Sequence, residues 1–140
     1  MADIFTDQAQ FMTLAGQTTD GLDYGQFGRY ADHVQEEAKE LAGSIQALDE
    51  DPVEVIDALV DTIVVSAGAL ISLIGVEGAR RAWKTVLTAN FKKILGSPHQ
   101  ENSGIHYRTD GQVGKPPGWI SPKADLERIA QEAGLIDDGK

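Results

Sequence analysis

The sequence predicts an all-α fold whose core is an antiparallel four-helix bundle and which assembles into an oligomer. Two observations support this prediction. Apolar residues recur at helical spacing over residues 4–95, and short breaks containing Gly, Pro or Asp divide that stretch into four segments. The chain has 140 residues, of which 41% are hydrophobic, which is enough for one core. We therefore expect residues 1–95 to form the bundle and residues 96–140 to complete the same domain.

The first predicted helix covers residues 4–14 and ends before Gly16. The second covers about residues 24–48, where apolar side chains from Phe27 to Ile45 recur every three or four positions. The sequence DEDP then breaks this helix. Because the connection to the next helix is short, we expect the two to be antiparallel neighbours.

The third helix is predicted to begin at Pro52, with Asp51 as its N-cap. Proline suits the first helical position because its φ is fixed and no N–H donor is needed there. Residues 59–74 are apolar on nearly all sides, so bundle partners or another subunit should cover this helix. Gly75 and Gly78 mark its end.

A fourth helix is predicted from about residue 77 to residue 95. Residues 96–121 are rich in Gly and Pro and predict a long loop with a small hairpin around the sequence TDG. Ser121 and Pro122 then resemble the N-cap and first residue of a short final helix that ends near Gly134.

The net charge is −10 and is unevenly distributed. Residues 1–61 hold fourteen of the 22 acidic residues but only two of the 12 basic ones. This composition disfavours nucleic acid as a partner, because binding it needs a concentrated basic surface. We expect an acidic site in the first half of the chain, faced by basic residues from the second half.

The chain has no cysteine, so any metal ion must be held by oxygen or imidazole ligands. The histidines are scattered without the spacing of a zinc site. The start, MADIFTDQAQF, lacks the basic segment and apolar run of a signal peptide. Residues 62–76 are the longest uncharged stretch, and a membrane span needs roughly twenty apolar residues. We expect a cytoplasmic protein that does not enter a membrane.

Carboxylates form a stripe on each of the two neighbouring helices. At 100° per residue, Glu36, Glu37 and Glu40 fall within an arc of about 100° on the second helix. On the third helix, an arc of about 60° holds a second set: Glu54, Asp57 and Asp61. Such groups repel unless a cation neutralises them, and Mg²⁺ or Mn²⁺ prefers carboxylate oxygens.

The simpler interpretation is that these acids form the wetted faces of amphipathic helices. Only Lys39 is interleaved among them, however, so the usual pairs of opposite charge are missing. The second set also lies on the helix that becomes wholly apolar one turn later. These two features favour a metal site.

The sequence EEAKEL, followed by a second acidic helix and an apolar run, resembles the MazG-like all-α nucleoside triphosphate pyrophosphohydrolases, whose signature is ExxE followed by ExxD. TANFKKIL is similar to an Asn-x-x-Lys element of the phage-type members, and YRTDGQVGKPPGWISPKADL is similar to their C-terminal tail. The resemblance implies metal-dependent hydrolysis of a nucleoside or deoxynucleoside triphosphate to the monophosphate and pyrophosphate. We expect a purine substrate such as dGTP or GTP. The similarity to phage-type members also suggests that the protein acts in the cytoplasm of a phage-infected bacterium.

The resemblance carries the first motif onto Glu37 and Glu40, with Glu36 beside them. The second motif can be read in two registers, because the literal ExxD begins at Glu54 and ends at Asp57, whereas the position just before the apolar run is Asp61. For the second motif we favour Asp57 and Asp61 as ligands, with Glu54 in support. Metal ligands are therefore expected among these carboxylates of both helices: Glu36, Glu37, Glu40, Glu54, Asp57 and Asp61. Catalytic roles are expected for Glu36, Glu37 and Asp57, and either Glu36 or Asp57 would accept the proton of the attacking water.

The resemblance also implies substrate-binding roles for four residues near the end of the chain: Asn90, Lys93, Arg108 and Lys115. Arg80, Arg81 and Lys84 are predicted to be surface or interface charges. Trp119 is predicted to be a packing anchor. Four residues are predicted to lie mainly in the core by their spacing, and one of them, with Gln10 or Gln17, is an alternative contact for a base: Phe11, Met12, Phe27 and Tyr30. The expected partners are the substrate and further copies of the chain, in a dimer or tetramer.

Two alternative functions stay open at this level. The same fold can act on a phosphoribosylated or modified nucleotide. It can also be a non-catalytic helical oligomer in which the acids hold cations for stability alone. A panel of substrates distinguishes these alternatives.

Overall fold

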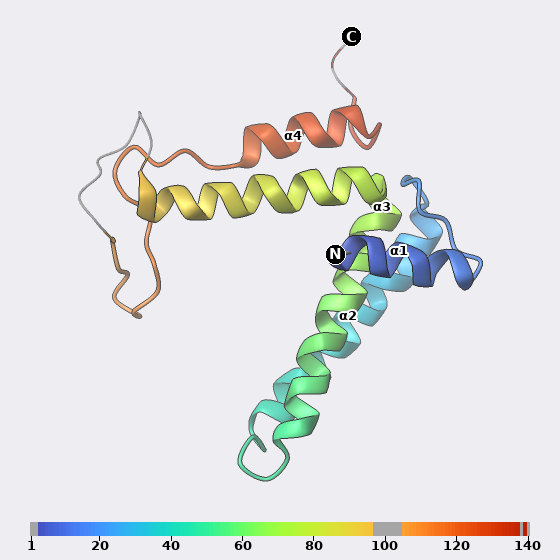
Figure 1. Cartoon of the computed structure of the whole chain (residues 1–140), viewed down its shortest axis with the longest axis horizontal. Helices are drawn as coiled ribbons and strands as arrows, with labels where there is room; N and C mark the ends of the chain where they lie inside the picture. The colour runs from blue at the N-terminus through green and yellow to red at the C-terminus, as the bar shows by residue number, and fades with distance from the viewer. Residues whose placement is uncertain (1–2, 97–104, 138, 140) are drawn as a thin grey trace.

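The structure is a computed structural model that describes residues 3–96, 105–137 and 139. In this part of the chain the fold is all-α, as predicted, with four helices and no strand. The helices are α1 (Ile4–Leu14), α2 (Tyr24–Ile45), α3 (Pro52–Leu95) and α4 (Lys123–Glu132). Helices α1, α2 and α3 pack together, and α4 lies against the second half of α3 (Figure 1).

Aspartate side chains cap the starts of the first three helices. Asp3 accepts a hydrogen bond from the Thr6 amide at 2.8 Å, and Asp51 accepts one from the Glu54 amide at 3.1 Å. Each cap satisfies an amide that has no carbonyl partner within the first turn. The predicted start of the third helix is therefore confirmed.

Two predicted ends differ slightly from the structure. Helix α2 ends at Ile45, before the predicted end near residue 48, because the following amides bond to carbonyls three residues back in a tight turn. Helix α4 begins at Lys123, with Pro122 in the N-cap position. Ser121 lies one residue earlier than a true N-cap, although its hydroxyl accepts from the Lys123 amide at 3.2 Å.

The third and fourth predicted helices form one element, α3, with a sharp change of direction at Gly75. This residue has φ 77° and ψ 171°, which is a backbone conformation that glycine alone adopts readily. Figure 1 shows the consequence: the first half of α3 runs antiparallel to α2, and the second half leads away at a large angle with α4 alongside it. The glycine thus changes the helix direction without an intervening loop.

The loop between α1 and α2 fills the break at Gly75. The Asp23 amide donates to the Ser72 carbonyl at 3.1 Å, and the Val76 amide donates to the Thr19 carbonyl at 3.3 Å. A helix break leaves carbonyls and amides without intrahelical partners, and buried backbone groups need replacements. The loop provides these replacements and holds the bend in place.

Buried polar side chains connect the bend to α2. The Gln26 side chain is buried and donates to the Ser72 hydroxyl at 2.8 Å and to the Thr18 carbonyl at 2.8 Å. The Tyr30 hydroxyl donates to the Gln17 side-chain oxygen at 2.5 Å. Because each buried polar group has a partner, this network adds specificity without an unpaired donor or acceptor.

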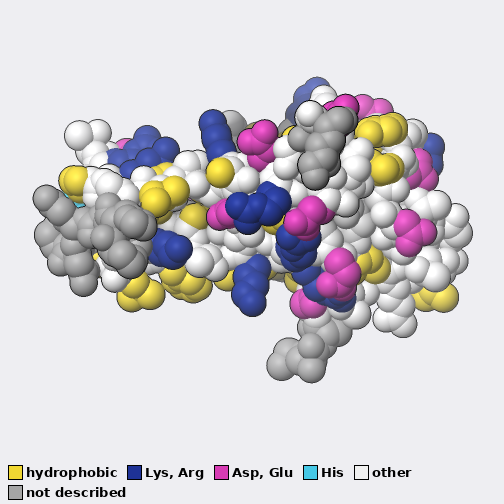
Figure 2. All heavy atoms as spheres, turned by 90° about the horizontal axis from the view of Figure 1, so that it is seen from above, with side chains coloured by type: hydrophobic (Ala, Val, Ile, Leu, Met, Phe, Trp, Pro, Cys, Tyr) yellow, Lys and Arg dark blue, Asp and Glu magenta, His cyan; other side chains and the backbone are white. Residues whose placement is uncertain are grey.

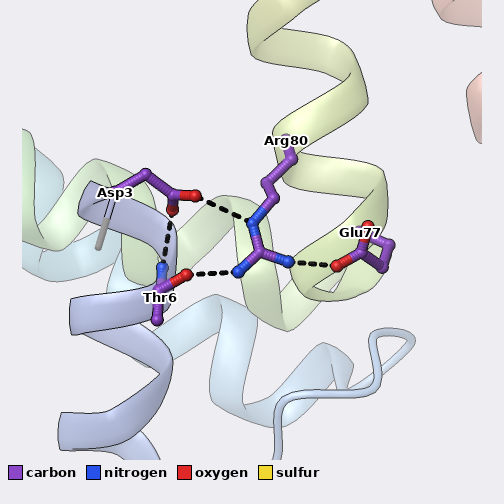
Figure 3. Close-up of polar contacts among 4 residues, drawn as sticks. All are labelled: Asp3, Thr6, Glu77 and Arg80. Carbon is purple, nitrogen blue, oxygen red and sulfur yellow. Dashed lines mark hydrogen bonds and ion pairs between the residues drawn. The ribbon is translucent and has the colours of Figure 1, made fainter. Parts of the chain in front are cut away.

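Arg80 connects the second half of α3 to the start of α1 (Figure 3). Its guanidinium donates to Asp3 at 3.0 Å and also to Thr6 and Glu77. Planar guanidinium groups suit several acceptors at once. Arg80 therefore makes intramolecular contacts that hold α1 against the second half of α3, and it is not a freely solvated surface charge.

The core of one chain is small, and much apolar surface stays exposed. The buried cluster consists of Phe5, Met12, Tyr30, Ala67, Ile71 and Ala79. Exposed apolar side chains follow both halves of α3: Val53, Ile56, Val60, Ile63 and Val64 before the bend, and Trp83, Val86, Leu87, Phe91 and Ile94 after it. A single chain therefore leaves the faces that a bundle would bury uncovered.

Helix α3 is long and apolar enough to cross a bilayer by those two criteria alone. Its most apolar window has a mean hydropathy of 2.2 and is 33% buried within the chain. The core helix of an oligomer satisfies the same criteria. Sedimentation without detergent distinguishes these two surroundings of the exposed face.

The segment after α3 contains a minimal hairpin, as predicted. Tyr107 and Val113 form an isolated antiparallel bridge, and the Arg108 amide donates to the Gln112 carbonyl at 2.7 Å. The indole N–H of Trp119 then donates to the Ala89 carbonyl of α3 at 2.7 Å. Trp119 anchors the segment to α3, in agreement with its predicted packing role.

Candidate functional site

One face of α2 carries buried polar residues and then acids. Gln26, Tyr30, His33 and Glu37 follow one another at intervals of three or four residues, so they share a face of the helix. The first two are buried against the bend and the first half of α3. The same face therefore directs Glu37 toward α3 rather than toward open solvent.

Glu37 is the acid with the most unusual surroundings. Its Oε2 atom is buried and has no hydrogen-bond partner among the described residues. Loss of solvation raises the pKa of its carboxyl group, and the negative charges of Glu40, Asp61 and Glu36 raise it further, whereas His33 opposes the shift. A buried carboxylate oxygen without a donor is the arrangement expected of a cation ligand or a proton acceptor.

The structure distinguishes among the acids of α3. Asp61 is partly buried and close enough for its charge to act on Glu37. Glu54 and Asp57 are exposed. Asp61 belongs to one of the two possible registers of the second motif. In that register the motif therefore places a carboxylate close to the acidic stripe on α2.

The remaining acids of α2 are more accessible. Glu36 and Glu40 are exposed, and Glu36 Oε2 lies 3.3 Å from His33 Nδ1. Among the described residues, no three acidic or histidine side chains converge closely enough to hold a metal ion as they stand. The donor set is nevertheless the hard-oxygen set that Mg²⁺ and Mn²⁺ prefer, and the unpartnered Glu37 oxygen fits a cation.

A pocket of about 300 Å³ extends along α2 as far as His33, whose ring lies 3.3 Å from Glu36. Its lining is aromatic and polar, from the α1 side and from the α2 face that leads to Glu37: Phe11, Gln17, Gln26, Arg29, Tyr30 and His33. Phe11 and Gln17 belong to the alternative base contact proposed from the sequence. Arg29 and His33 were not anticipated, although Arg29 follows Gln26 by three residues and His33 follows Tyr30 by three, which was a readable signal.

The four predicted substrate-binding residues lie elsewhere in the chain. At 1.5 Å per residue, Asp61 precedes the bend by roughly 21 Å of helix, and Lys93 follows it by roughly 27 Å. Figure 1 shows the end of α3 directed away from α2. Lys93 and Asn90 therefore do not reach the carboxylates within one chain, and Arg108 and Lys115 follow them on the same distal part.

Two of these residues meet at Trp119. Lys93 Nζ lies 5.1 Å and Lys115 Nζ 5.3 Å from the centre of the indole ring. Both contacts are within the range of cation–π attraction. Arg108 instead pairs with Asp110 at 3.0 Å, and Asn90 is exposed.

No protein-family model matches this chain, and no curated protein matches it significantly.

Proposed function

We propose that the protein hydrolyses a nucleoside or deoxynucleoside triphosphate to the monophosphate and pyrophosphate, with Mg²⁺ or Mn²⁺ as cofactor. The observation that carries this proposal is the buried, unpartnered oxygen of Glu37, held beside Glu40 and Asp61 on facing helices. This concentration of negative charge favours cation binding, and the resemblance of EEAKEL to the MazG-like signature supplies the substrate class.

A divalent cation bound at this site would polarise the α-phosphate and increase the acidity of a water molecule. Glu37, Glu40 and Asp61 are the residues proposed to hold it, with Glu54 and Asp57 near the same stripe. Water forms the new bond to the α-phosphorus, and the bond from that phosphorus to the bridging oxygen of the pyrophosphate breaks. The pyrophosphate leaves with the electrons of that bond.

The proton of the attacking water needs an acceptor. Glu36 suits this role because its carboxylate is accessible and lies 3.3 Å from His33 Nδ1. Asp57 is the alternative acceptor on α3. Exchange of Glu36 for Gln should therefore lower kcat more than it changes cation affinity.

The adjoining pocket offers a place for the nucleoside. Phe11 provides an aromatic surface, and Gln17 and Arg29 provide hydrogen-bond donors near it. A base in this pocket would leave the phosphates at the carboxylates one or two turns further along α2. We propose that the base is a purine, as in dGTP or GTP.

We further propose that a second copy of the chain closes the antiparallel four-helix bundle, in a dimer or tetramer. The exposed apolar stripe on both halves of α3 is the surface that such an assembly would bury. Asn90, Lys93, Arg108 and Lys115 would then contact the substrate's phosphates from the neighbouring copy. Positive charge near the departing pyrophosphate would stabilise it.

The test is pyrophosphate release from all eight common NTPs and dNTPs, with Mg²⁺, with Mn²⁺ and with chelator. The wild type is compared with a Glu37→Gln, Glu40→Gln double variant. The matched control, Asp49→Asn, Glu50→Gln, neutralises two carboxylates in the exposed turn after α2. We expect cation-dependent release from one or two nucleotides, retained in the control and abolished in the double variant.

Absence of release from all eight nucleotides would contradict the proposal for common nucleotides. Release from a phosphoribosylated or modified nucleotide would then favour the same chemistry on another substrate. Thermal stabilisation by the cation, without turnover of any substrate, would instead favour a non-catalytic, metal-stabilised oligomer.

A further inference from the structure

A second hollow lies on the opposite arm of the molecule, between the second half of α3 and α4. Its volume is about 700 Å³, and four cationic side chains line it: Arg81, Lys84, Lys92 and Arg128. Asp125 is the one acidic residue among the described residues that line it. Figure 2 shows Lys and Arg side chains along this arm, with Asp and Glu among them where α4 lies.

The charge of this hollow contrasts with that of the whole chain, which has a net charge of −10. Arg81 is paired with Glu132, and Arg128 lies 3.4 Å from Asp125. Lys84 has no ion-pair partner in the described part of the chain. The lining therefore keeps an excess of positive charge, and an anion would relieve the mutual repulsion of these groups.

The other lining groups indicate which kind of anion fits. Hydroxyl donors come from α3 and from the segment that leads into α4: Thr85, Thr88 and Ser121. Helix α4 begins beside this last residue, and the positive end of its dipole adds to the attraction for an anion. Arginine, lysine and hydroxyl groups together are the donors that bind phosphate oxygens.

The hollow also has an apolar part, to which Ala89, Ile120 and Ile129 contribute. Its volume is in the range of sites for small organic ligands. An inorganic ion alone would leave most of this space and all of the apolar surface without a contact. A ligand that combines a phosphate chain with a ring system would use both parts.

The exposed apolar side chains of the arm lie mostly away from this hollow. By the angle of 100° per residue, Trp83, Leu87 and Ile94 lie roughly on the opposite side of α3 from Arg81, Thr88 and Lys92. Phe91 instead lies within about 20° of Lys84, at the edge of the hollow. A second copy that covers Trp83, Leu87 and Ile94 would leave the side lined by Arg81, Thr88 and Lys92 open.

We propose that this basic hollow is a binding site for a polyphosphorylated small molecule of nucleotide size, distinct from the carboxylate site on α2. This inference does not depend on the proposed hydrolysis, because the two sites lie on different arms of α3. The ligand is identified by chemistry alone: several phosphates, held by Lys84 and the arginines, and a ring against the apolar part.

The test is isothermal titration calorimetry with tripolyphosphate and with ATP, in the presence of excess EDTA so that no cation supports binding at the carboxylates. We expect both ligands to bind the full chain. A Lys84→Gln, Arg128→Gln variant should bind about tenfold more weakly, because two partly exposed charge pairs are lost. The matched control, Lys39→Gln, Lys123→Gln, loses two charges outside the hollow and should bind as the wild type does.

A second variant, for which tighter binding is expected, separates a change in affinity from a loss of folding. Asp125→Asn removes the acid from the lining and should tighten binding about threefold, since one repulsive charge is lost. Far-UV circular dichroism confirms that each variant is folded before titration. Tighter binding of ATP than of tripolyphosphate would assign part of the affinity to the apolar surface, and equal binding would assign it to the phosphates.

The proposal is overturned if neither ligand binds at millimolar concentration. It is also overturned if the control variant loses as much affinity as the Lys84 and Arg128 variant, because the attraction would then be one of general charge. Failure of nucleotide hydrolysis in the earlier experiment leaves this test unaffected, since no turnover is measured here.

Discussion

Gly21 lies directly against Gly75, so that a Cβ atom on Gly21 would be 2.8 Å from the backbone nitrogen of Gly75. Both glycines have positive φ, 91° and 77° respectively. The contact joins the loop after α1 to the bend of α3 at a distance that no side chain would permit. The direction of both halves of α3 depends on this close approach.

The first prediction concerns the bend. Gly75→Ala should lower the free energy of unfolding by about 3 kcal/mol, because its backbone conformation is unfavourable for alanine and its Cβ would lie 3.0 Å from the Asp20 carbonyl oxygen. Urea unfolding followed by circular dichroism measures the change. Gly28→Ala is the matched control, since Gly28 lies within α2 with no atom within 4 Å of the added Cβ. It should raise stability by roughly 0.5–1 kcal/mol, and equal effects of the two changes would refute this account of the bend.

The second prediction concerns Glu37 in the absence of divalent cations. Its raised pKa means that the folded state binds a proton more readily than the unfolded state does. Stability should therefore fall as the pH rises from the usual glutamate value through the raised pKa, and stay low above it. Glu37→Gln should remove this decrease and raise the melting temperature at neutral pH.

The control for this experiment is Glu50→Gln, which neutralises an exposed acid in the turn after α2. Adding Mg²⁺ or Mn²⁺ should raise the melting temperature of the wild type and of the control but not that of Glu37→Gln. A wild type whose melting temperature is indifferent to both cations would argue against a metal site at Glu37.

The third prediction concerns the exposed face of α3. We expect the wild type to sediment as a dimer or tetramer without detergent, and Ile63→Glu to sediment as a smaller species, because a buried interface does not accept an unpaired charge. Gln35→Glu adds the same charge on an exposed position of α2 and should leave the assembly intact. A wild type that stays monomeric, or that partitions into vesicles rather than self-associating, would show that another copy does not cover this face.

The fourth prediction concerns the attachment of the C-terminal segment. Trp119→Ala removes the hydrogen bond to the Ala89 carbonyl and the ring beneath Lys93 and Lys115. Trypsin should then cleave after Arg108 several-fold faster, since proteolysis follows local opening. Tyr107→Ala is the control, because this aromatic residue of the same segment is 66% exposed. Cleavage rates that are unchanged by Trp119→Ala would contradict the anchoring role.

Much of the fold was predictable because its signals are local. The bounds of α1, the cap formed by Asp51 and the break at Gly75 all follow from side chains within a few residues of the feature. The anchoring role of Trp119 was also correctly anticipated. The end of α2 was placed too late, because the residues after Ile45 continue an apolar pattern while their backbone has already changed to a tight turn.

The candidate site was only partly predictable for a related reason. Periodicity places Glu37 and Asp61 on stripes of their own helices, but it does not tell which members of two stripes meet. Packing of Gln26 and Tyr30 against the bend rotates α2 so that Glu37 approaches Asp61, while Glu54 and Asp57 stay exposed. The expectation that Lys93 and Lys115 face these acids cannot be met within one chain and stays a prediction about the assembly.

Sequence alone therefore predicts the all-α class, the starts of α1, α2 and α3, the position of the bend and the two acidic stripes, because each depends on helical spacing or on a nearby cap or glycine. The direction of the two halves of α3, the encounter of Glu37 with Asp61, and the hollow between α3 and α4 appear only in the folded chain. These features join residues far apart along the chain, and they depend on how the loop before α2 fills the break and how Trp119 and α4 dock. No local pattern encodes such contacts, because their energy is gained only when the packed surfaces meet.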